Sequence, residues 1–517
     1  MHFWHKRYFN TSGPNIRAEH YTLSRSALVE VCRQMVHHDR YFTIWAPRQT
    51  GKSTYFRFLA EVLEAEGYKV AFVNFENFSN ATLESFLFEF HENLQNSWGM
   101  SFELLSLEAT FTTISSIKDQ KFVLIIDEVE GINPSFFGTV LHSIRNVYHT
   151  RQNHALKSVI LVGVSNIVGV VQDNASPFNI SDNLNVPYFT DAETRELLAQ
   201  HEDETGQHFE ESVKQKIIAI TANQPGLVNG FAWKLTQEFH EKKVIEFDDY
   251  LKVEYWYLHE SIDKNVSNII NKGKKHRQFI EKLLFTDYTE LFQVNREHIR
   301  ELSANGLIKK GEDGNVVFHV PLYKKALQTA FYPYINGERK YIGGNIEIDD
   351  YFIKNEQENS AKGDKLRLDK IIEKYKEYAT KRGFRHFREK DEKGNFLGLR
   401  ESALVYSFET YISAFLEVVG GKSYLEAHAG LGRTDLLVNV QGHEYVFEAK
   451  VYANITQFNR GKGQLAYYLK SLGLQTGIYL VFVENTITHS KVLEAVETIE
   501  GIEIVTHLIW YDMETSF

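Results

Sequence analysis

Two stretches of this chain carry groups suited to phosphate chemistry. The first is Ala46–Thr54, APRQTGKST, which follows an apolar run and opens a helical pattern. Backbone N–H groups of such a loop surround a β-phosphate, Lys52 reaches the β/γ oxygens and Ser53 holds Mg²⁺. Ala46 stands where a first Gly is usual, so we expect a slightly altered loop entry. The residues expected to bind ATP are Pro47, Arg48, Gln49, Thr50, Gly51, Lys52, Ser53 and Thr54.

The segment Lys121–Glu130, KFVLIIDEVE, supplies the acids that a P-loop needs. We expect Asp127 to bind the Mg²⁺ through water and Glu128 to polarise an attacking water. A buried strand capped by two solvated acids is the alternative. Asn166, after a further apolar run, is either a sensor of the γ-phosphate or a strand-to-loop cap.

The second stretch lies near the C-terminus, where two apolar runs meet at a turn containing Gly442. Asp435 opens the first run, and Glu448 and Lys450 share one face of the second. With the carbonyl of Ala449, the two acids can hold one or two Mg²⁺ or Mn²⁺ ions, while Lys450 orients a nucleophile or stabilises a transition state. A structural ion pair is the alternative.

In the first 200 residues, the predicted strands alternate with predicted helices. Apolar runs predict buried strands, and helical patterns such as 54–66 and 134–149 lie between them, so we expect a parallel sheet with helices on both faces. From Thr190, a capping-box residue, the pattern becomes helical. The predicted strands are 41–45, 69–75, 122–126, 158–164 and 186–189.

The fold class is therefore α/β multidomain, with about three or four units in 517 residues. Two helical stretches (277–284 and 296–305) and a hairpin over 307–320 outline a winged helix, and the polar segment 354–365 resembles a linker. The predicted domains are a phosphate-binding core with an N-terminal extension (1–195), a helical region (196–268), a winged helix (269–335), a linker (336–365) and a C-terminal α/β domain (366–517). The family resemblances given below imply that the first is an ATPase core, the second a lid and the last a nuclease domain.

Composition limits the classes of protein. Hydrophobic residues make up 43% and charged residues 24%, as in packed proteins, and the single Cys32 fits a reducing compartment. No apolar stretch is long enough to span a membrane and no apolar segment follows Met1–Arg7, so we expect a cytoplasmic protein. The net charge of −11 leaves room for a local basic groove. The basic cluster Lys272–Arg277, with Lys309 and Lys310, can contact DNA, or the winged helix can serve only in protein packing.

Further stretches give the N-terminal part a family resemblance. FNTSGP at Phe9–Pro14, the pair His20 and Tyr21, the APRQTGKST loop and Asn223–Asn229 resemble prokaryotic AAA-like ATPases of the AAA+ and STAND type. The resemblance covers roughly 5–330 and implies an ATPase core, a small lid and a winged helix. It also implies that His20 and Tyr21 lie near the nucleotide base and that a homo-oligomer is plausible.

The C-terminal part, roughly 366–517, resembles the PD-(D/E)XK nucleases, with Asp435, Glu448 and Lys450 in the motif positions. The resemblance implies an additional metal-facing acid at Glu409, in a helix over 406–418. It also implies a RecB-like helix in which Gln464 and Tyr468 reach the site or the DNA backbone. A role in defence against foreign DNA is a further implication.

These features together predict an ATP-binding and ATP-hydrolysing protein coupled to a Mg²⁺-dependent nuclease that cuts DNA. The alternatives are a nucleotide-dependent switch that binds DNA or a protein and cuts nothing, and a nuclease that is active without ATP.

Overall fold

A computed structural model gives the fold, and it separates into two compact units. The first comprises Met1–Glu254, Ile262–Ile269 and Leu291–Tyr323, and the second comprises Tyr255–Ser261, Ile270–Glu290 and Lys324–Phe517. The structure describes residues 7–102, 106–164, 182–261, 263–331, 348–354, 363–384, 387, 389–391, 394, 397–425, 428–429, 432–485, 487 and 492–511. No helix in these ranges is both long and apolar enough to cross a membrane.

The first unit is built on a five-stranded sheet in the order β2-β3-β4-β1-β5, in which every pairing is parallel. Four of the predicted strands are confirmed. The prediction of a strand over 186–189 is wrong, because the strand is 182–185 and Pro187, which has no N–H, follows its end. The strands are β1 (Phe42–Trp45), β2 (Lys69–Asn74), β3 (Phe122–Asp127), β4 (Leu156–Gly163) and β5 (Asp182–Asn185).

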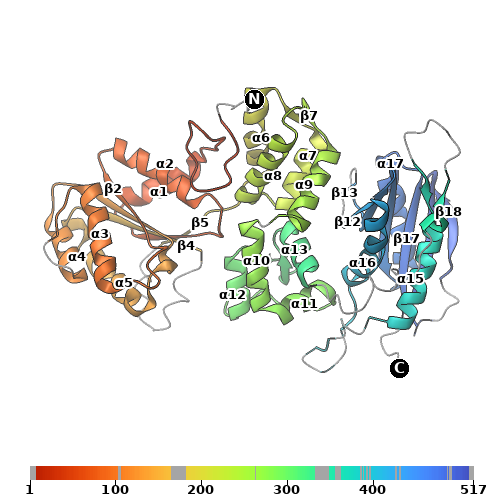
Figure 1. Ribbon diagram of the computed structural model, residues 1–517. Coiled ribbons are helices and arrows are strands. Elements are labelled where there is room, and N and C mark those ends of the chain that lie inside the picture. Colours follow the sequence, from red (N-terminus) through yellow and green to blue (C-terminus); the bar gives the residue numbers. More distant parts are fainter. Residues whose placement is uncertain are drawn as a thin grey trace. The chain divides into compact units, whose positions relative to one another are not determined.

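Helices cover both faces of this sheet, as predicted (Figure 1). Alternate residues of β3 point to opposite faces, so Val123 and Ile125 pack with α1 and α2, whereas Leu124 and Ile126 pack with α3, α4 and α5. The sheet is therefore buried on both sides, which explains its continuous apolar strands. The helices are α1 (Ser26–His37), α2 (Lys52–Ala65), α3 (Leu83–Trp98), α4 (Leu107–Ser116) and α5 (Pro134–Tyr148).

A helical region follows the sheet, and its first helix begins at the predicted capping box. Thr190 Oγ1 accepts a hydrogen bond from Glu193 N at 3.1 Å, and Thr190 N donates to Glu193 Oε2 at 2.8 Å. Two N–H groups at the helix start are thereby satisfied. The helices are α6 (Asp191–Thr205), α7 (Glu211–Thr221), α8 (Pro225–Glu238) and α9 (Phe247–His259), and the strands β6 (His208–Phe209) and β7 (Val244–Ile245) pair in parallel.

The elements expected of a winged helix occur in the predicted order. The two compact units divide them: α11 belongs to the second unit, whereas α12 and the β8–β9 hairpin belong to the first. A winged helix as one domain therefore stays a prediction. The elements are α10 (Lys264–Lys275), α11 (Arg277–Phe285), α12 (Glu297–Ala304), β8 (Ile308–Lys310), β9 (Val316–Phe318) and α13 (Pro321–Phe331).

The second unit contains a six-stranded mixed sheet in the order β12-β15-β16-β17-β19-β18. β15 and β16 form the predicted hairpin, with Gln441 and Gly442 at positive φ in its turn. The strands are β12 (Lys422–Leu425), β15 (Leu436–Val440), β16 (His443–Val451), β17 (Thr476–Glu484), β18 (Ala495–Ile499) and β19 (Ile502–Tyr511), and short pairs are made by β10 (Phe352–Ile353) with β11 (Lys365–Leu366) and by β13 (His428–Ala429) with β14 (Gly432–Arg433).

Three helices cover this sheet on its two faces. Phe447 of β16 packs against Phe408 of α16 (Glu401–Val419), and Phe482 of β17 packs against Tyr375 of α15 (Leu368–Arg382). Tyr479, which points to the opposite face of the sheet, packs against Phe458 of α17 (Ile455–Ser471). Glu448 is the register partner of Tyr479 and so faces the α17 side. Of the predicted linker, residues 336–347 and 355–362 lie outside the described ranges.

The capping box generates a prediction about stability. Replacing Thr190 by Ala removes the hydroxyl that caps α6 and should lower the free energy of unfolding by about 1 kcal/mol. Equilibrium urea unfolding followed by circular dichroism measures the change. Thr190→Ser keeps the hydroxyl and should stay close to the wild type, and equal losses in both variants would contradict the assignment.

Candidate functional site

The APRQTGKST loop joins β1 to α2, as predicted. Two residues of the loop have left-handed backbone, Gln49 with φ 57° and Gly51 with φ 86°, and Gly51 is the N-cap of α2. Ala46 is not among the residues with positive φ, so its Cβ causes no strain at the loop entry. The strained position is Gln49, a residue type that rarely adopts this conformation.

Lys52 lies in the first turn of α2 and its side chain is buried. Its Nζ donates to the carbonyl oxygens of Ala46 at 2.8 Å and Pro47 at 3.1 Å. Burial lowers the pKa of Lys52, and the negative charges of Glu128 and Asp127 oppose that shift. The ammonium is thus held beside the loop, where a bound phosphate would compete with the two carbonyls.

Ser53 and Asp127 meet as the sequence predicted. Ser53 Oγ donates to Asp127 Oδ2 at 2.7 Å, and Asp127 Oδ1 accepts from Glu128 N at 2.9 Å. A hydroxyl and a carboxylate in direct contact form an oxygen donor set of the kind that Mg²⁺ prefers. These two residues therefore fit the metal that accompanies a nucleotide triphosphate.

Glu128 follows β3 with a left-handed backbone, φ 49°, and is half-buried. Burial raises its pKa above the usual range, with Lys52 acting against this shift and Glu130 and Asp127 adding to it. A positive φ at a non-glycine residue beside a phosphate loop is the kind of strain found at functional sites. The geometry suits the predicted role of Glu128 as a base.

Glu130 is a residue that sequence reasoning missed. Its Oε1 accepts a hydrogen bond from the backbone N–H of Val164 at 2.8 Å, directly after β4. The carboxylate thereby ties the segment after β3 to the end of β4. The predicted sensor, Asn166, comes two residues after Val164 in the sequence. Asn166 itself lies outside the described residues. The sequence did offer one signal for this role, because Glu130 is an acidic residue only two positions after Glu128.

The second predicted site assembles around Lys450. Its Nζ lies 2.9 Å from Glu448 Oε1 and 3.6 Å from Asp435 Oδ2, and it donates to the Ala449 carbonyl at 3.1 Å. Asp435 Oδ2 also accepts from Ala449 N at 2.7 Å. The hairpin of β15 and β16 brings these groups together, so the structure places all three motif residues in one cluster.

A third carboxylate in this cluster comes from Glu401, in the first turn of α16, which the sequence did not single out. Glu401 Oε2 lies 3.1 Å from Lys450 Nζ. The expected acid of this helix, Glu409, lies eight residues further on, roughly 12 Å along the axis. It accepts a hydrogen bond from Ser423 Oγ at 2.7 Å and lines a different pocket, with Tyr255 and His259. The structure therefore does not bring Glu409 to the cluster.

A cavity of about 570 Å³ opens beside the cluster. Asp435 and Glu401 line it, and so does Tyr468 of α17, which agrees with the expected position of that residue. Gln464, one turn earlier on α17, is half-buried and is not among the residues that line the cavity. The volume lies within the range of ligand sites in proteins.

The charges of this cluster suit a divalent cation. Three carboxylates lie within 3.6 Å of the Lys450 ammonium. Burial and the charge of Asp435 raise the pKa of Glu448, and Glu448 Oε2 is buried without a hydrogen-bond partner among the described residues. Burial alone would lower the pKa of Lys450, but the carboxylates raise it above its usual range. Asp435, Glu448 and the Ala449 carbonyl fit Mg²⁺ or Mn²⁺ as oxygen ligands.

Comparison with known families decides the class of the N-terminal part. The model of the AAA-like domain family matches residues 12–329, more than half of the chain. The chain belongs to the AAA-like domain family. The Ala46–Thr54 loop and the acids at the end of β3 lie within the matched residues. No curated protein matches the chain significantly.

Solved structures resemble part of this AAA-like protein. A Walker-type ATPase of Pyrococcus abyssi is 15% identical, covers 62% of this chain and 99% of its own, and has a TM-score of 0.46. The Orc1 protein of Aeropyrum pernix in complex with DNA is 14% identical, with coverages of 60% and 93% and a TM-score of 0.35. The RuvB Holliday junction branch migration motor of Thermotoga maritima is 12% identical, with coverages of 56% and 90% and a TM-score of 0.34.

Residues at the start of α8 donate hydrogen bonds to the backbone of the P-loop in this AAA-like protein. Gln224 Nε2 donates to the carbonyl of Arg48 at 3.1 Å, and Gly226 N donates to the carbonyl of Gln49 at 3.0 Å. A Cβ at Gly226 would collide with the Gln49 side chain. The Asn223–Asn229 segment, singled out by its family resemblance, therefore contacts the loop directly.

The turn before β8 also packs on the P-loop. A Cβ at Gly306 would meet Pro47 at 3.1 Å and would collide with the Tyr188 hydroxyl. The Tyr188 ring stacks on His319 with centroids 4.6 Å apart. Burial lowers the pKa of His319 from 6.5 to about 4, with the positive charge of Lys309 adding to the shift.

The N-terminal segment makes hydrogen bonds to both α2 and α6. Asn15 N donates to Thr54 Oγ1 at 3.0 Å, and the Tyr21 hydroxyl lies 3.3 Å from His201 Nδ1. His20 is buried, and its Nδ1 accepts from Ile16 N at 2.8 Å. Contact of His20 or Tyr21 with a nucleotide base stays a prediction.

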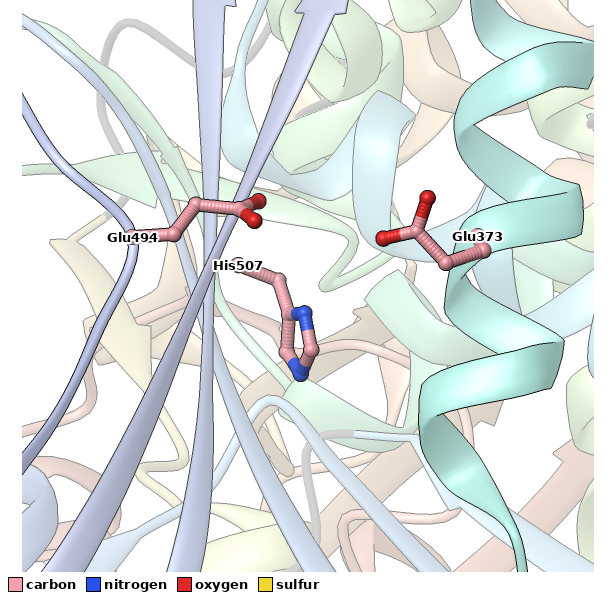
Figure 2. A group of neighbouring side chains, drawn as sticks. All are labelled: Glu373, Glu494 and His507. Atoms are coloured by element: carbon pink, nitrogen blue, oxygen red, sulfur yellow. The ribbon is translucent and has the colours of Figure 1, made fainter.

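A separate group of residues of the types that bind metals lies between α15 and the six-stranded sheet. Glu373 of α15, Glu494 and His507 of β19 face one another, with ligand atoms within 4.8 Å (Figure 2). Lys376 Nζ lies 2.6 Å from both glutamates, and Leu508 N donates to Glu494 Oε1 at 2.7 Å. Lys376 pairs with both carboxylates, so the group is an ion-pair network that ties α15 to the sheet.

The half-buried His319 generates a prediction about pH. Between pH 6.5 and about 4 the folded chain keeps His319 neutral, whereas the unfolded chain binds a proton there, so stability falls as the pH falls. His319→Phe keeps an aromatic ring against Tyr188 and cannot titrate. The melting temperature of the wild type should therefore drop more across this range than that of His319→Phe. Parallel pH profiles of the two proteins would contradict the prediction.

Proposed function

We propose that this AAA-like protein hydrolyses ATP at its P-loop and that its second unit is a Mg²⁺-dependent nuclease that hydrolyses DNA phosphodiester bonds. The observation that carries the nuclease is the convergence of Asp435, Glu448 and Glu401 on Lys450 beside an open cavity. The observation that carries the ATPase is the Ser53–Asp127 contact next to Lys52 and Glu128.

In the ATPase site, Lys52 exchanges its two loop carbonyls for phosphate oxygens, and the loop N–H groups bind the β-phosphate. Glu128 accepts a proton from the attacking water. Its raised pKa brings it closer to the working range of a general base. Ser53 and Asp127 hold the Mg²⁺ that accompanies the nucleotide.

In the nuclease site, Asp435 and Glu448 bind the metal with the Ala449 carbonyl. The metal ion lowers the pKa of water and offsets the charge of the scissile phosphate. Lys450 orients the nucleophile and stabilises charge that develops on the phosphate. Glu401 holds Lys450 in position through their 3.1 Å ion pair.

A nucleotide-dependent switch that binds DNA or a protein and cuts nothing is the second candidate. The compact ion pairing of Lys450 with three carboxylates favours it, because such a cluster can stabilise a hairpin without chemistry. This candidate requires ATP binding without metal-dependent cleavage.

The ATPase proposal predicts separate effects for two residues. Lys52→Ala should weaken ATP binding, because the ammonium that reaches the phosphates is lost. Glu128→Gln should leave binding intact and lower the rate of hydrolysis by roughly 10²–10⁴-fold, the range of general base catalysis. Calorimetric titration and phosphate release measure the two effects. Arg57→Ala, which removes an exposed basic residue of α2, is the control and should change neither.

The nuclease proposal predicts that Lys450→Ala and Glu448→Gln abolish Mg²⁺-dependent cleavage of linear duplex DNA. Glu401→Gln should lower cleavage strongly, whereas Glu409→Gln should not, because only Glu401 reaches Lys450. Gel electrophoresis of the products measures the activity, and Lys470→Ala, on the exposed surface of α17, is the control. Circular dichroism confirms that each variant folds.

Four results would decide between the candidates. Cleavage that survives Lys450→Ala contradicts the assigned site. Binding of ATP without cleavage of any DNA favours the switch. Cleavage that ATP changes in the wild type but not in Lys52→Ala shows that the two sites are coupled, and cleavage indifferent to Lys52→Ala shows a nuclease that acts without ATP.

A further inference from the structure

The last helix of the family match, α13, forms part of the nuclease cavity. Lys324 and Gln328 line the cavity of about 570 Å³ that Asp435 and Glu401 also line. The two residues are four apart and therefore share one face of the helix. Lys325, between them, is buried and donates to the carbonyl of Leu425 at 2.8 Å, which attaches α13 to the end of β12.

Gln328 is an unusual residue for the part of the cavity wall that α13 forms. Its side chain is fully buried, and neither its Nε2 nor its Oε1 has a hydrogen-bond partner in the part of the chain that the structure describes. Buried amides are almost always hydrogen-bonded, because the loss of water is otherwise uncompensated. An amide offers a donor and an acceptor side by side, a pattern that matches the polar edge of a nucleotide base.

Positive groups lie around this wall. Lys324 and Arg400 line the cavity, and Arg400 is held by its donation to the Tyr288 carbonyl at 3.1 Å. The end of α10 also contacts α13, since a Cβ at Gly273 would meet Leu327 and Phe331. The basic cluster Lys272–Arg277 therefore begins next to α13.

We propose that α13 seats the DNA strand next to the cleavage site, with Gln328 hydrogen-bonding a nucleotide and Lys324, Arg400 and the Lys272–Arg277 cluster binding the backbone phosphates. This inference rests on the proposed nuclease function, since it takes the acid cluster as the place of cleavage. A cavity lined both by acids that could hold a metal and by cations matches a phosphate chain.

The arrangement also gives the AAA-like segment a part in the second site. The family match ends at residue 329, yet residues 270–290 and 324–329 lie in the second compact unit. The backbone of α11 and the residues after it hold both neighbours of Glu401: Arg400 N donates to the Phe285 carbonyl at 3.1 Å, and Ser402 Oγ donates to the Leu284 carbonyl. The AAA-like segment thus positions the acid helix and supplies the strand-binding wall.

Gln328→Leu provides the sharpest test. Leu has a similar volume and no polar atoms, so a Gln328 with only a structural role would give unchanged DNA binding and an equal or higher melting temperature. We expect instead that the full-length Gln328→Leu protein melts no lower than the wild type but binds DNA about tenfold more weakly. Fluorescence anisotropy with a labelled single-stranded or duplex DNA, without divalent metal, measures binding while nothing is cut.

The lysines are tested by salt dependence in the same assay. Lys324→Ala and Lys274→Ala should each reduce the slope of log binding constant against log salt by about 1, since each removes a phosphate contact. Lys370→Ala, which removes an exposed lysine of α15, is the matched control and should leave the slope unchanged. An RNA of the same sequence, run in parallel, shows whether DNA is the preferred strand.

The outcomes separate this inference from the proposed nuclease. If the wild type cuts DNA but none of the three variants weakens binding, the strand-binding role of α13 is overturned and the nuclease stands. If the variants lose DNA binding but the wild type never cuts, the nuclease falls and α13 remains a DNA-binding surface. Tighter binding of RNA than of DNA, or an equal loss in Lys370→Ala, would overturn the inference as stated.

Discussion

A lysine ammonium, buried at Lys52 and half-buried at Lys450, organises each candidate site. An unpaired charge away from water is very costly, so each lysine must be surrounded by oxygen atoms. Lys52 satisfies this need with two carbonyls of its own loop, and Lys450 satisfies it with three carboxylates and one carbonyl. The partners are therefore drawn into one place in both cases: the loop carbonyls at Lys52, and at Lys450 the carboxylates, two of which are the proposed metal ligands.

The two sites differ in how far they depend on distant parts of the chain. The P-loop is built from contiguous residues, and its supports, such as Gln224 of α8, bind its backbone from outside. The cluster at Lys450 instead needs Glu401 from α16, whose neighbours are held by the backbone of the last residues of α11. A change in α11 can thus reach the second site without any contact to the reacting groups.

Much of the fold could be predicted from the sequence because its signals are local. Apolar runs and the capping box at Thr190 gave the first sheet and α6, since each depends on neighbouring residues. The strand expected at 186–189 failed because an apolar run alone does not show which residues pair, and Pro187 lies inside it. Membership of the AAA-like family agrees with the resemblance of the loop motifs.

By itself the sequence determined the P-loop residues, Asp127 and Glu128, and the trio of Asp435, Glu448 and Lys450, because strand alternation and loop spacing fix these positions locally. Only the tertiary structure decided that Glu401 reaches Lys450 while Glu409 faces another pocket, that Glu130 joins two strand ends, and that Gln328 lines the cavity beside the Lys450 cluster. Those contacts join segments far apart in the chain, and packing, which no local pattern records, sets which of them meet.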